Sequence, residues 1–298
     1  MVDFETESRD CARDIEAALD ALLTAERLGS PGIPPERLIA AMRHGSLSGG
    51  KRLRPLLVRQ AASLFGVPPK AALPAGLAVE MIHCYSLIHD DLPAMDDDDL
   101  RRGRPTVHRA FDEATAILAG DALLTHAFGV LATAGDTPEV TVRLVRALAT
   151  AAGAGGMAGG QMRDIEGETV PLGAEAIAQM QAMKTGALIS AAVHIGAILG
   201  NASGNQLTAL LGYGDTIGQA FQLADDILDV TASAEAMGKA TGKDAVAGKQ
   251  TLVALIGVDA ARRQLAELTH DALGALSAFG PEAEGLRATA RYFADRES

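Results

Sequence analysis

The twelve prolines constrain this chain most, because their spacing leaves room for long helices along most of it. None falls between Pro171 and Pro281. The segments between the prolines are rich in Ala, Leu, Glu, Gln, Arg and Met, which favour helices. No block of alternating β-branched residues is bounded by hairpin signals, which argues against a sheet. We therefore expect an all-α fold, with helices within residues 5–28, 35–44, 56–65, 75–91, 110–134, 138–152, 174–199, 206–231 and 252–279.

Length and composition indicate a globular protein with a large core, since 48% of the 298 residues are hydrophobic. No Ser/Pro/Gly-rich linker and no repeat divides the chain, so we expect one domain over residues 1–298. The net charge of -12 argues against a nucleic-acid partner, which requires a basic surface. An acidic protein that binds an anion must use a metal or a local basic pocket.

Several features predict a cytoplasmic protein without a membrane span. Only Cys11 and Cys84 occur, which indicates a reducing compartment. The acidic N-terminal segment lacks the cationic start and apolar core of a signal peptide. The apolar run over residues 186–200 is shorter than the ~20 residues that a bilayer span needs. We expect this run to form a buried helix of the bundle.

Six aspartates lie within the ten residues from Asp90 to Asp99, and arginines follow at 101, 102 and 104. The group follows a predicted helix, where carboxylates oppose the helix dipole. Such a local violation is typical of a functional site, although a solvated acidic turn remains an alternative. A calcium loop starting at Asp96 is excluded, because Arg101 and Val107 occupy its glycine and glutamate positions.

A second acidic group, Asp225, Asp226 and Asp229, lies inside an apolar run. Helical periodicity places Asp225 and Asp229 on one face with Phe221, and Gln222 lies beside them. A solvated helix face would also explain this pattern if it stood alone. Two carboxylates about 4 Å apart repel by roughly 4 kcal/mol at an effective dielectric near 20. Two such groups beside arginines therefore indicate a site for divalent metal and diphosphate.

The segment from Gly49 to Pro55 places three cations after two glycines, which suits the approach of a diphosphate. An ordinary basic turn before a helix is the alternative. The spacing from Gly45 imitates a phosphate-binding P-loop, but Arg52 replaces the required Ser or Thr, so we reject that motif. His83 lies seven residues before Asp90, on nearly the same helical face.

Taken together, these motifs resemble the trans-polyprenyl diphosphate synthases, most closely the bacterial farnesyl diphosphate synthases. The resemblance covers most of the chain in the expected order. It is carried by residues 49–55, by Asp90 to Asp96 with Arg101-Arg102-Gly103, by Lys184-Thr185, by Phe221-Gln222, and by Asp225 to Asp229. The resemblance implies a single large helical bundle around a central cavity (the isoprenoid synthase fold), usually a homodimer.

The implied activity is a magnesium-dependent prenyl transfer from dimethylallyl or geranyl diphosphate to isopentenyl diphosphate, giving farnesyl diphosphate. The resemblance implies the following roles. Two or three Mg²⁺ ions are held by Asp90, Asp91, Asp96, Asp225 and Asp229. The allylic diphosphate is bound by Arg101, Lys184, Thr185, Phe221, Gln222 and Lys239. Isopentenyl diphosphate is bound by Gly50, Lys51, Arg54, His83 and Arg102. The run 238–249 resembles a loop that closes over the metals.

The resemblance also places control of product length near Tyr85 and Ser86, which precede the first acidic group. Tyr85 lies about 7.5 Å deeper along the helix than Asp90. Its ring and the two extra residues Pro93 and Ala94 are typical of a fifteen-carbon product. Ser86 leaves room, so geranylgeranyl diphosphate stays an alternative, as does geranyl diphosphate, and Tyr85 could also be packed core.

Two rival functions share part of this pattern. A class I terpene cyclase would use the same metals, but it has no use for the second diphosphate site of Lys51, Arg54 and His83. A non-catalytic subunit of a heteromeric prenyltransferase generally lacks one acidic group, whereas this chain has both.

Overall fold

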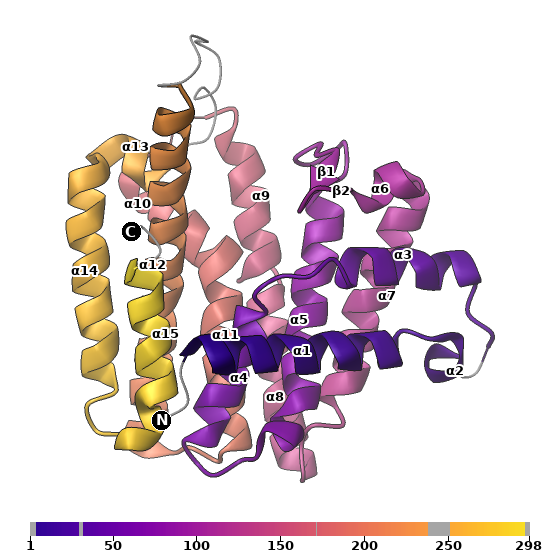
Figure 1. Cartoon of the computed structure of the whole chain (residues 1–298), viewed down its shortest axis with the longest axis horizontal. Coiled ribbons are helices and arrows are strands. Elements are labelled where there is room, and N and C mark those ends of the chain that lie inside the picture. Colours follow the sequence, from indigo (N-terminus) through magenta and orange to yellow (C-terminus); the bar gives the residue numbers. More distant parts are fainter. Residues whose placement is uncertain (1–3, 30–31, 171, 238–250, 296–298) are drawn as a thin grey trace.

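Fifteen α-helices follow one another along the residues that the structure, a computed structural model, describes: 4–29, 32–170, 172–237 and 251–295 (Figure 1). The all-α prediction is confirmed. The helices are α1 (Phe4–Leu22), α2 (Ala25–Leu28), α3 (Glu36–Ser46), α4 (Leu53–Ser63), α5 (Pro69–Asp90), α6 (Val107–Ala110), α7 (Glu113–Leu131), α8 (Pro138–Ala152), α9 (Met157–Gly167), α10 (Ala174–Gln181), α11 (Ala187–Leu199), α12 (Gly204–Met237), α13 (Leu252–Ile256), α14 (Val258–Ala275) and α15 (Glu284–Asp295). A π-helical turn (Ala182–Gly186) joins α10 to α11, and a 3₁₀ turn (Pro281–Ala283) precedes α15.

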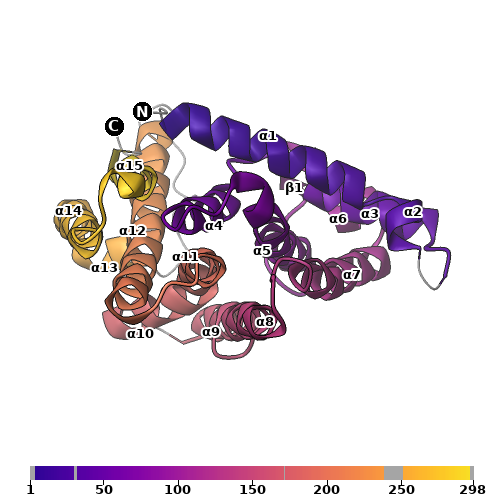
Figure 2. The same cartoon turned by 90° about the horizontal axis from the view of Figure 1, so that it is seen from below.

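Helix α11 lies at the centre, where it packs on α4, α5, α8 and α12 (Figure 2). Its side chains are apolar almost all round, and Leu188, Ile189, Val193, Ile195 and Ile198 are all buried. A helix that is apolar on every face needs neighbours on every side. This composition therefore fixes α11 as the core helix, and the expectation of a buried helix over residues 186–200 is confirmed within the described part of the chain.

The two acidic groups lie at the same end of the bundle. Helix α5 begins with Pro69 at its first position, where proline lacks only an N–H that would be unpaired anyway. It ends at Asp90, the start of the first acidic group. Helix α12 carries the second group toward its own C-terminal end. Both ends point to the top of Figure 1. Helices α1 and α3 cross the bundle below this end in the same view.

Helices α6, α9 and α15 and one hairpin differ from the sequence-based expectation, α6 being a four-residue helix just before α7. Helices α9 and α15 were not expected, because α9 contains three glycines and α15 follows Pro281. The expectation of no sheet was wrong at one place, where strands β1 (Leu100–Arg101) and β2 (Arg104–Pro105) pair antiparallel. Positive φ angles at Arg102 (51°) and Gly103 (74°) form the two-residue turn between them.

Three helical stretches are long and apolar enough to cross a membrane by length and composition alone: Pro69–Asp90, Glu113–Leu131 and Ala174–Leu199. Between 39% and 61% of the residues in their apolar windows are buried inside the bundle. Part of the apolar surface of these helices is therefore buried against other helices of the bundle. The expectation that the chain has no membrane span stays a prediction, as do the cytoplasmic location and the single domain.

Candidate active site

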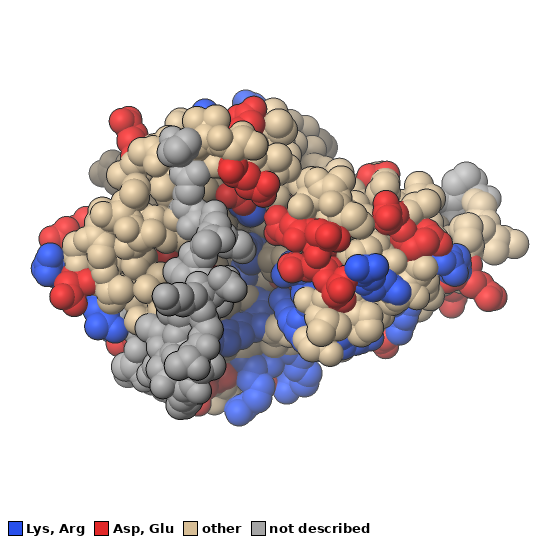
Figure 3. Space-filling view, turned by 90° about the horizontal axis from the view of Figure 1, so that it is seen from above, with Lys and Arg blue, Asp and Glu red and all other residues tan. Residues whose placement is uncertain are grey.

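A cavity of about 280 Å³ opens at the end of the bundle where the acidic groups lie. Seen from that end, the molecule is hollowed, with Lys and Arg in the hollow and Asp and Glu along its rim (Figure 3). The cavity is lined by Arg54, His83, Tyr85, Ser86, Leu87, His89, Asp90, Met95, Met157, Ala158, Gln161, Lys184 and Thr185. Seven of these residues were predicted from the sequence. A larger cavity of about 640 Å³ beside α8 and α11 contains none of the predicted residues.

The first acidic group divides into residues with different surroundings. Asp90 lines the cavity. The backbone N–H of Asp96 donates to the Asp90 carbonyl (2.8 Å), which folds the loop back over the end of α5. Asp91 is buried and accepts a hydrogen bond from Arg101 Nε (2.6 Å). Asp91 and Arg101, both predicted to act on metal or substrate, therefore already neutralise each other.

Burial raises the pKa of the Asp90 carboxyl to about 7. Lys184 lowers this pKa and Asp96 and Asp91 raise it. In the folded chain without a cation, the Asp90 carboxylate is thus destabilised by its surroundings. A divalent ion would remove this penalty, because it favours the charged form.

This raised pKa predicts how stability depends on pH. An unfolded Asp ionises near pH 4, so between about pH 4 and 7 the folded state binds more protons. Stability therefore falls as the pH rises through this window. Replacing Asp90 by Asn should remove that part of the slope, so the variant should gain a few degrees in Tm over the wild type at pH 8 but not at pH 4. Thermal unfolding in EDTA measures the difference, and a constant difference at both pH values would contradict it.

The second acidic group also divides. Asp226 is buried and accepts hydrogen bonds from Gln222 Nε2 (2.8 Å) and Gln181 Nε2 (2.7 Å). Asp225 is half-buried and Asp229 is exposed. The helical spacing thus separates one structural aspartate from the two that share the other face. Gln181 is a residue that the sequence analysis missed, and its only signal was a polar side chain three positions before Lys184.

Within the described ranges, no three Asp, Glu, His or Cys side chains gather closely enough to enclose an ion by themselves. Mg²⁺ commonly takes one or two carboxylates and fills its other positions with water and substrate phosphates. The carboxylate oxygens of Asp90 and Asp225 fit that chemistry, and a bound cation would favour the charged form of Asp90, whose pKa burial raises. The magnesium assignment stays a prediction.

Arg54 and His83 make the cavity a site for an anion. Burial lowers the pKa of Arg54, and its buried Nε has no hydrogen-bond partner among the described residues. Burial and the neighbouring guanidinium groups, Arg54 foremost, hold the pKa of His83 well below its usual range, so the ring is neutral. A buried donor without an acceptor is unfavourable. A diphosphate oxygen would supply that acceptor. The negative charge of Asp225 favours the charged form of Arg54, so the second acidic group influences the pKa of this arginine.

Lys184 and Thr185 lie in the π-helical turn Ala182–Gly186, a type of irregularity that is frequent at functional sites. Lys184 Nζ donates to Asp164 Oδ2 at 2.5 Å, which holds it beside the cavity. Helix α9 approaches this turn closely, because a Cβ on Gly160 would lie 2.1 Å from the backbone nitrogen of Lys184. The glycines that weaken the helix signal of α9 thus allow this packing.

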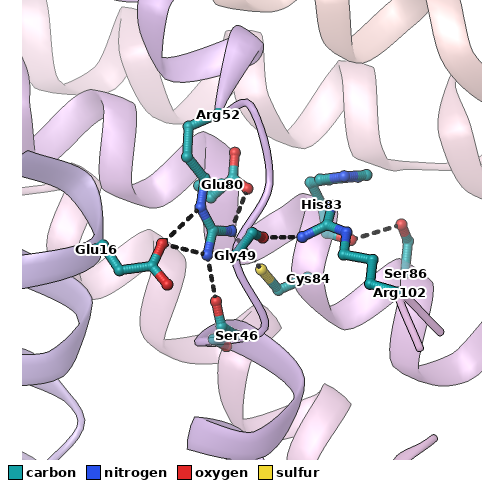
Figure 4. A network of polar contacts seen from close by, with 9 residues as sticks. All are labelled: Glu16, Ser46, Gly49, Arg52, Glu80, His83, Cys84, Ser86 and Arg102. Atoms are coloured by element: carbon teal, nitrogen blue, oxygen red, sulfur yellow. Dashed lines mark hydrogen bonds and ion pairs between the residues drawn. The ribbon is translucent and has the colours of Figure 1, made fainter. Parts of the chain in front are cut away.

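The basic segment before α4 is anchored by the buried ion pair of Arg52 and Glu80 (Figure 4). Arg52 donates to Glu80 Oε1 (2.6 Å), to Glu16 Oε2 (2.9 Å) and to the Ser46 carbonyl (2.6 Å). Burial is the largest single effect and opposes the charge of Arg52, but Glu80, Cys84 and Glu16 together outweigh it and raise the pKa of Arg52. The backbone of Arg52 lies in the left-handed region (φ 48°), which turns the chain into α4.

The same segment also contacts the β1–β2 hairpin. The Arg102 guanidinium donates to the Gly49 carbonyl. A Cβ on Gly50 would lie 2.5 Å from a nitrogen of the same guanidinium group. Gly50 also has a φ of 126°, so this position requires glycine. Lys51 is exposed and donates to the hydroxyl of Tyr292, a partner 241 residues away that the sequence analysis missed.

The remaining predicted residues have different outcomes. Phe221 is half-buried and packs edge-on against Phe293 (5.0 Å between centroids). Lys239 and the predicted closing run 238–249 lie outside the described residues. The structure therefore brings together Arg54, His83, Tyr85, Ser86, Asp90, Lys184 and Thr185, whereas Asp225 and Asp229 do not line the same cavity.

Comparison with known proteins gives one family. The Polyprenyl synthetase family matches residues 35–278. The chain is 43% identical to a farnesyl diphosphate synthase of Escherichia coli over 99% of both chains. It is also 43% identical to a chloroplastic geranylgeranyl pyrophosphate synthase of Catharanthus roseus, over 99% of this chain and 82% of that protein.

Solved structures agree with this result. An FPP/GFPP synthase of Zymomonas mobilis superposes with a TM-score of 0.87 at 43% identity, over 98% of each chain. A geranyltransferase of Legionella pneumophila superposes with a TM-score of 0.86 at 33% identity, over 99% of this chain and 97% of that one. The resemblance drawn from the motifs is confirmed. The chain belongs to the polyprenyl synthetase family.

Proposed function

We propose that the chain is a magnesium-dependent prenyltransferase that adds isopentenyl diphosphate to dimethylallyl and geranyl diphosphates and releases farnesyl diphosphate. The observation that carries the proposal is the cavity itself. It combines Arg54, whose buried Nε has no hydrogen-bond partner among the described residues, with the Asp90 carboxyl, whose pKa is raised. Similarity over the full length to a farnesyl diphosphate synthase supports the same reaction.

In this proposal the two diphosphates occupy different walls. Isopentenyl diphosphate is bound by Lys51, Arg54 and the neutral His83, with Gly50 giving its backbone room to approach. The allylic diphosphate lies toward Asp90 and Lys184, with Arg101, Thr185, Phe221, Gln222 and Lys239 as its further predicted contacts. Mg²⁺ held by Asp90, Asp91, Asp96, Asp225 and Asp229 would draw negative charge from the leaving diphosphate.

The reaction then needs no protein nucleophile. The allylic carbon–oxygen bond breaks, and its electron pair leaves with the diphosphate, whose charge the site's cations stabilise. The isopentenyl double bond attacks the resulting allylic cation, and a proton is lost to the released diphosphate. Water would trap the cation, so the cavity wall must be apolar. Met95 and Met157 supply such a wall beside Tyr85.

The experiment that tests the function is elongation of defined primers. Purified protein is incubated with Mg²⁺, isopentenyl diphosphate and either dimethylallyl, geranyl or farnesyl diphosphate, and the products are sized. We expect farnesyl diphosphate from the first two primers and no elongation of the third. Failure to elongate any primer would refute the enzymatic proposal. Elongation of farnesyl diphosphate would favour the geranylgeranyl alternative, which similarity to the Catharanthus roseus protein keeps open.

Tyr85 lines the cavity beside Ser86, and its ring packs edge-on against His89 (5.7 Å between centroids). If this ring closes the end of the channel, Tyr85→Ala should extend products beyond fifteen carbons. Product sizing with geranyl diphosphate as primer measures the shift. Ser86→Ala is the matched control, since it leaves the ring in place and should keep the fifteen-carbon product. An unchanged distribution in Tyr85→Ala would remove Tyr85 from length control.

The rival functions fit the structure less well. A terpene cyclase does not need the second anion site of Lys51, Arg54 and His83. A non-catalytic subunit generally lacks one acidic group, and this chain carries both. We also propose a homodimer, as the family resemblance implies. The exposed apolar side chains of Ile117, Leu118 and Val142 on α7 and α8 offer a surface for it.

A further inference from the structure

Tyr292 of α15 lies beside Lys51, although the two residues come from opposite ends of the chain. Lys51 Nζ donates a hydrogen bond to Tyr292 Oη. The same Nζ lies 5.1 Å from the centroid of the tyrosine ring, which is close enough for a cation–π contact. One tyrosine thus contacts the ammonium group through both its ring and its hydroxyl. Among the residues described, Lys51 has no carboxylate within ion-pair distance, unlike Lys184, which is paired with Asp164.

The Tyr292 ring is fixed by other aromatic side chains. It packs on Phe4 of α1 (4.6 Å between centroids) and lies 6.0 Å from Phe293. Phe293 is fully buried and contacts Phe221 of α12. Four of the ten Phe and Tyr residues therefore form one chain of ring contacts across three helices. This packing limits the positions that the Tyr292 hydroxyl can take.

The hydrogen-bond roles leave donors available for a ligand. The Tyr292 oxygen accepts from Lys51, so its own O–H is left to donate, and no acceptor for it occurs among the described residues. Lys51 retains two further N–H groups. The pair therefore presents several donors and no acidic group, which is an arrangement suited to phosphate oxygens. Lys51 immediately precedes the anchored Arg52, so the backbone on which this pair depends is held by the Glu80 ion pair.

We propose that the Tyr292 hydroxyl completes the diphosphate site of isopentenyl diphosphate, by orienting Lys51 and by donating its own proton to a diphosphate oxygen. The proposal rests on the proposed function, in which Lys51 binds this substrate. It adds a residue from the C-terminal helix to a site that otherwise consists of α4, α5, the loop before α4 and Arg102 in the β1–β2 turn. The allylic substrate, bound toward Asp90 and Lys184, does not depend on Tyr292.

Tyr292→Phe tests this proposal, because the variant keeps the ring, its packing on Phe4 and the cation–π contact, and loses only the hydroxyl. We expect the KM for isopentenyl diphosphate to rise about tenfold, since hydrogen bonds to a charged group are lost. The KM for geranyl diphosphate and kcat should change less than twofold. An unchanged KM for isopentenyl diphosphate, or an equal rise for both substrates, would overturn the proposal.

Two further variants separate binding from structure. Phe4→Leu removes the neighbouring ring but keeps the hydroxyl, so it should lower Tm and raise the KM for isopentenyl diphosphate less than Tyr292→Phe does. Lys51→Met should itself raise the KM for isopentenyl diphosphate, and adding Tyr292→Phe to it should then have less than its separate effect, because the two groups act as one unit. Fully additive effects would count against the pair.

Calorimetric titration distinguishes this proposal from the function itself. The titration uses isopentenyl diphosphate with wild type and Tyr292→Phe, and it needs no turnover. If the wild type elongates no primer, the proposed function fails, but a tenfold weaker binding to Tyr292→Phe would still support the site. Equal binding to both proteins would overturn the Tyr292 proposal even if the wild type is an active synthase.

Discussion

Replacing Asp90 by asparagine is expected to lower kcat for prenyl transfer about 1,000-fold while the protein stays folded. The carboxylate lies at the end of α5 and lines the cavity. Removing a group that holds a catalytic metal forfeits several kcal/mol of transition-state stabilisation, and each 1.36 kcal/mol is a factor of ten in rate. Stability should not suffer, because burial already raises the pKa of Asp90 to about 7 and the neutral amide avoids the buried charge. Initial rates at saturating Mg²⁺ measure the loss.

Asp97→Asn is the matched control, since it makes the same chemical change seven residues away. Asp97 is exposed and has a φ of 52°, a conformation that asparagine also adopts readily. It does not line the cavity, so kcat should stay within twofold of the wild type. If Asp90→Asn kept more than a tenth of the wild-type kcat, or if both variants lost activity equally, Asp90 would not have the proposed role.

Much of the fold follows from local sequence rules. Helix-forming composition between prolines predicts most of the bundle, and a run of residues without charge predicts the buried α11. Two features escape these rules. Helix α9 exists because its glycines allow close packing on the π-helical turn at Lys184, a tertiary contact that outweighs propensity. The β1–β2 hairpin has only two residues in each strand, too few for a strand pattern to appear.

In the site, too, local sequence rules do not predict the tertiary contacts of single side chains. Residue type and spacing predict which aspartates gather at one end of the bundle. They do not predict that Asp91 is paired with Arg101, or that Asp226 is held by two glutamines. Neighbouring residues on a helix point 100° apart, so adjacent aspartates have different partners that depend on the packing of other helices. Lys51 and Tyr292 are 241 residues apart in the sequence, and no local pattern predicts their contact.

In a chain with a net negative charge, a site for two diphosphates requires the positively charged side chains to be grouped at that site. The net charge is -12, yet the Nε of Arg54 is buried in the cavity without a hydrogen-bond partner among the described residues, and His83 beside it is neutral. The unmet donor of Arg54 is thus a local exception to the rule that buried polar groups are paired, and such exceptions are typical of binding sites.

Replacing Glu80 by glutamine is expected to lower the free energy of unfolding by about 3 kcal/mol, because it leaves the buried charge of Arg52 without its closest partner. Both side chains are almost fully buried, with 2% and 1% of their surfaces exposed, and they lie 2.6 Å apart. Urea unfolding measures the change. Glu284→Gln breaks ion pairs with Arg287 and Arg291 on the surface and should lose no more than about 1 kcal/mol.

A double variant separates the charge from the packing. Arg52→Met combined with Glu80→Leu removes both charges and should recover most of the stability lost in Glu80→Gln, because an apolar pair of similar volume can replace a buried ion pair. Its KM for isopentenyl diphosphate should nevertheless be higher than that of the wild type, since Lys51 and Arg54 flank the position that the ion pair fixes. A loss of less than 1 kcal/mol in Glu80→Gln would show that Glu16, which also pairs with Arg52, is sufficient to hold this turn.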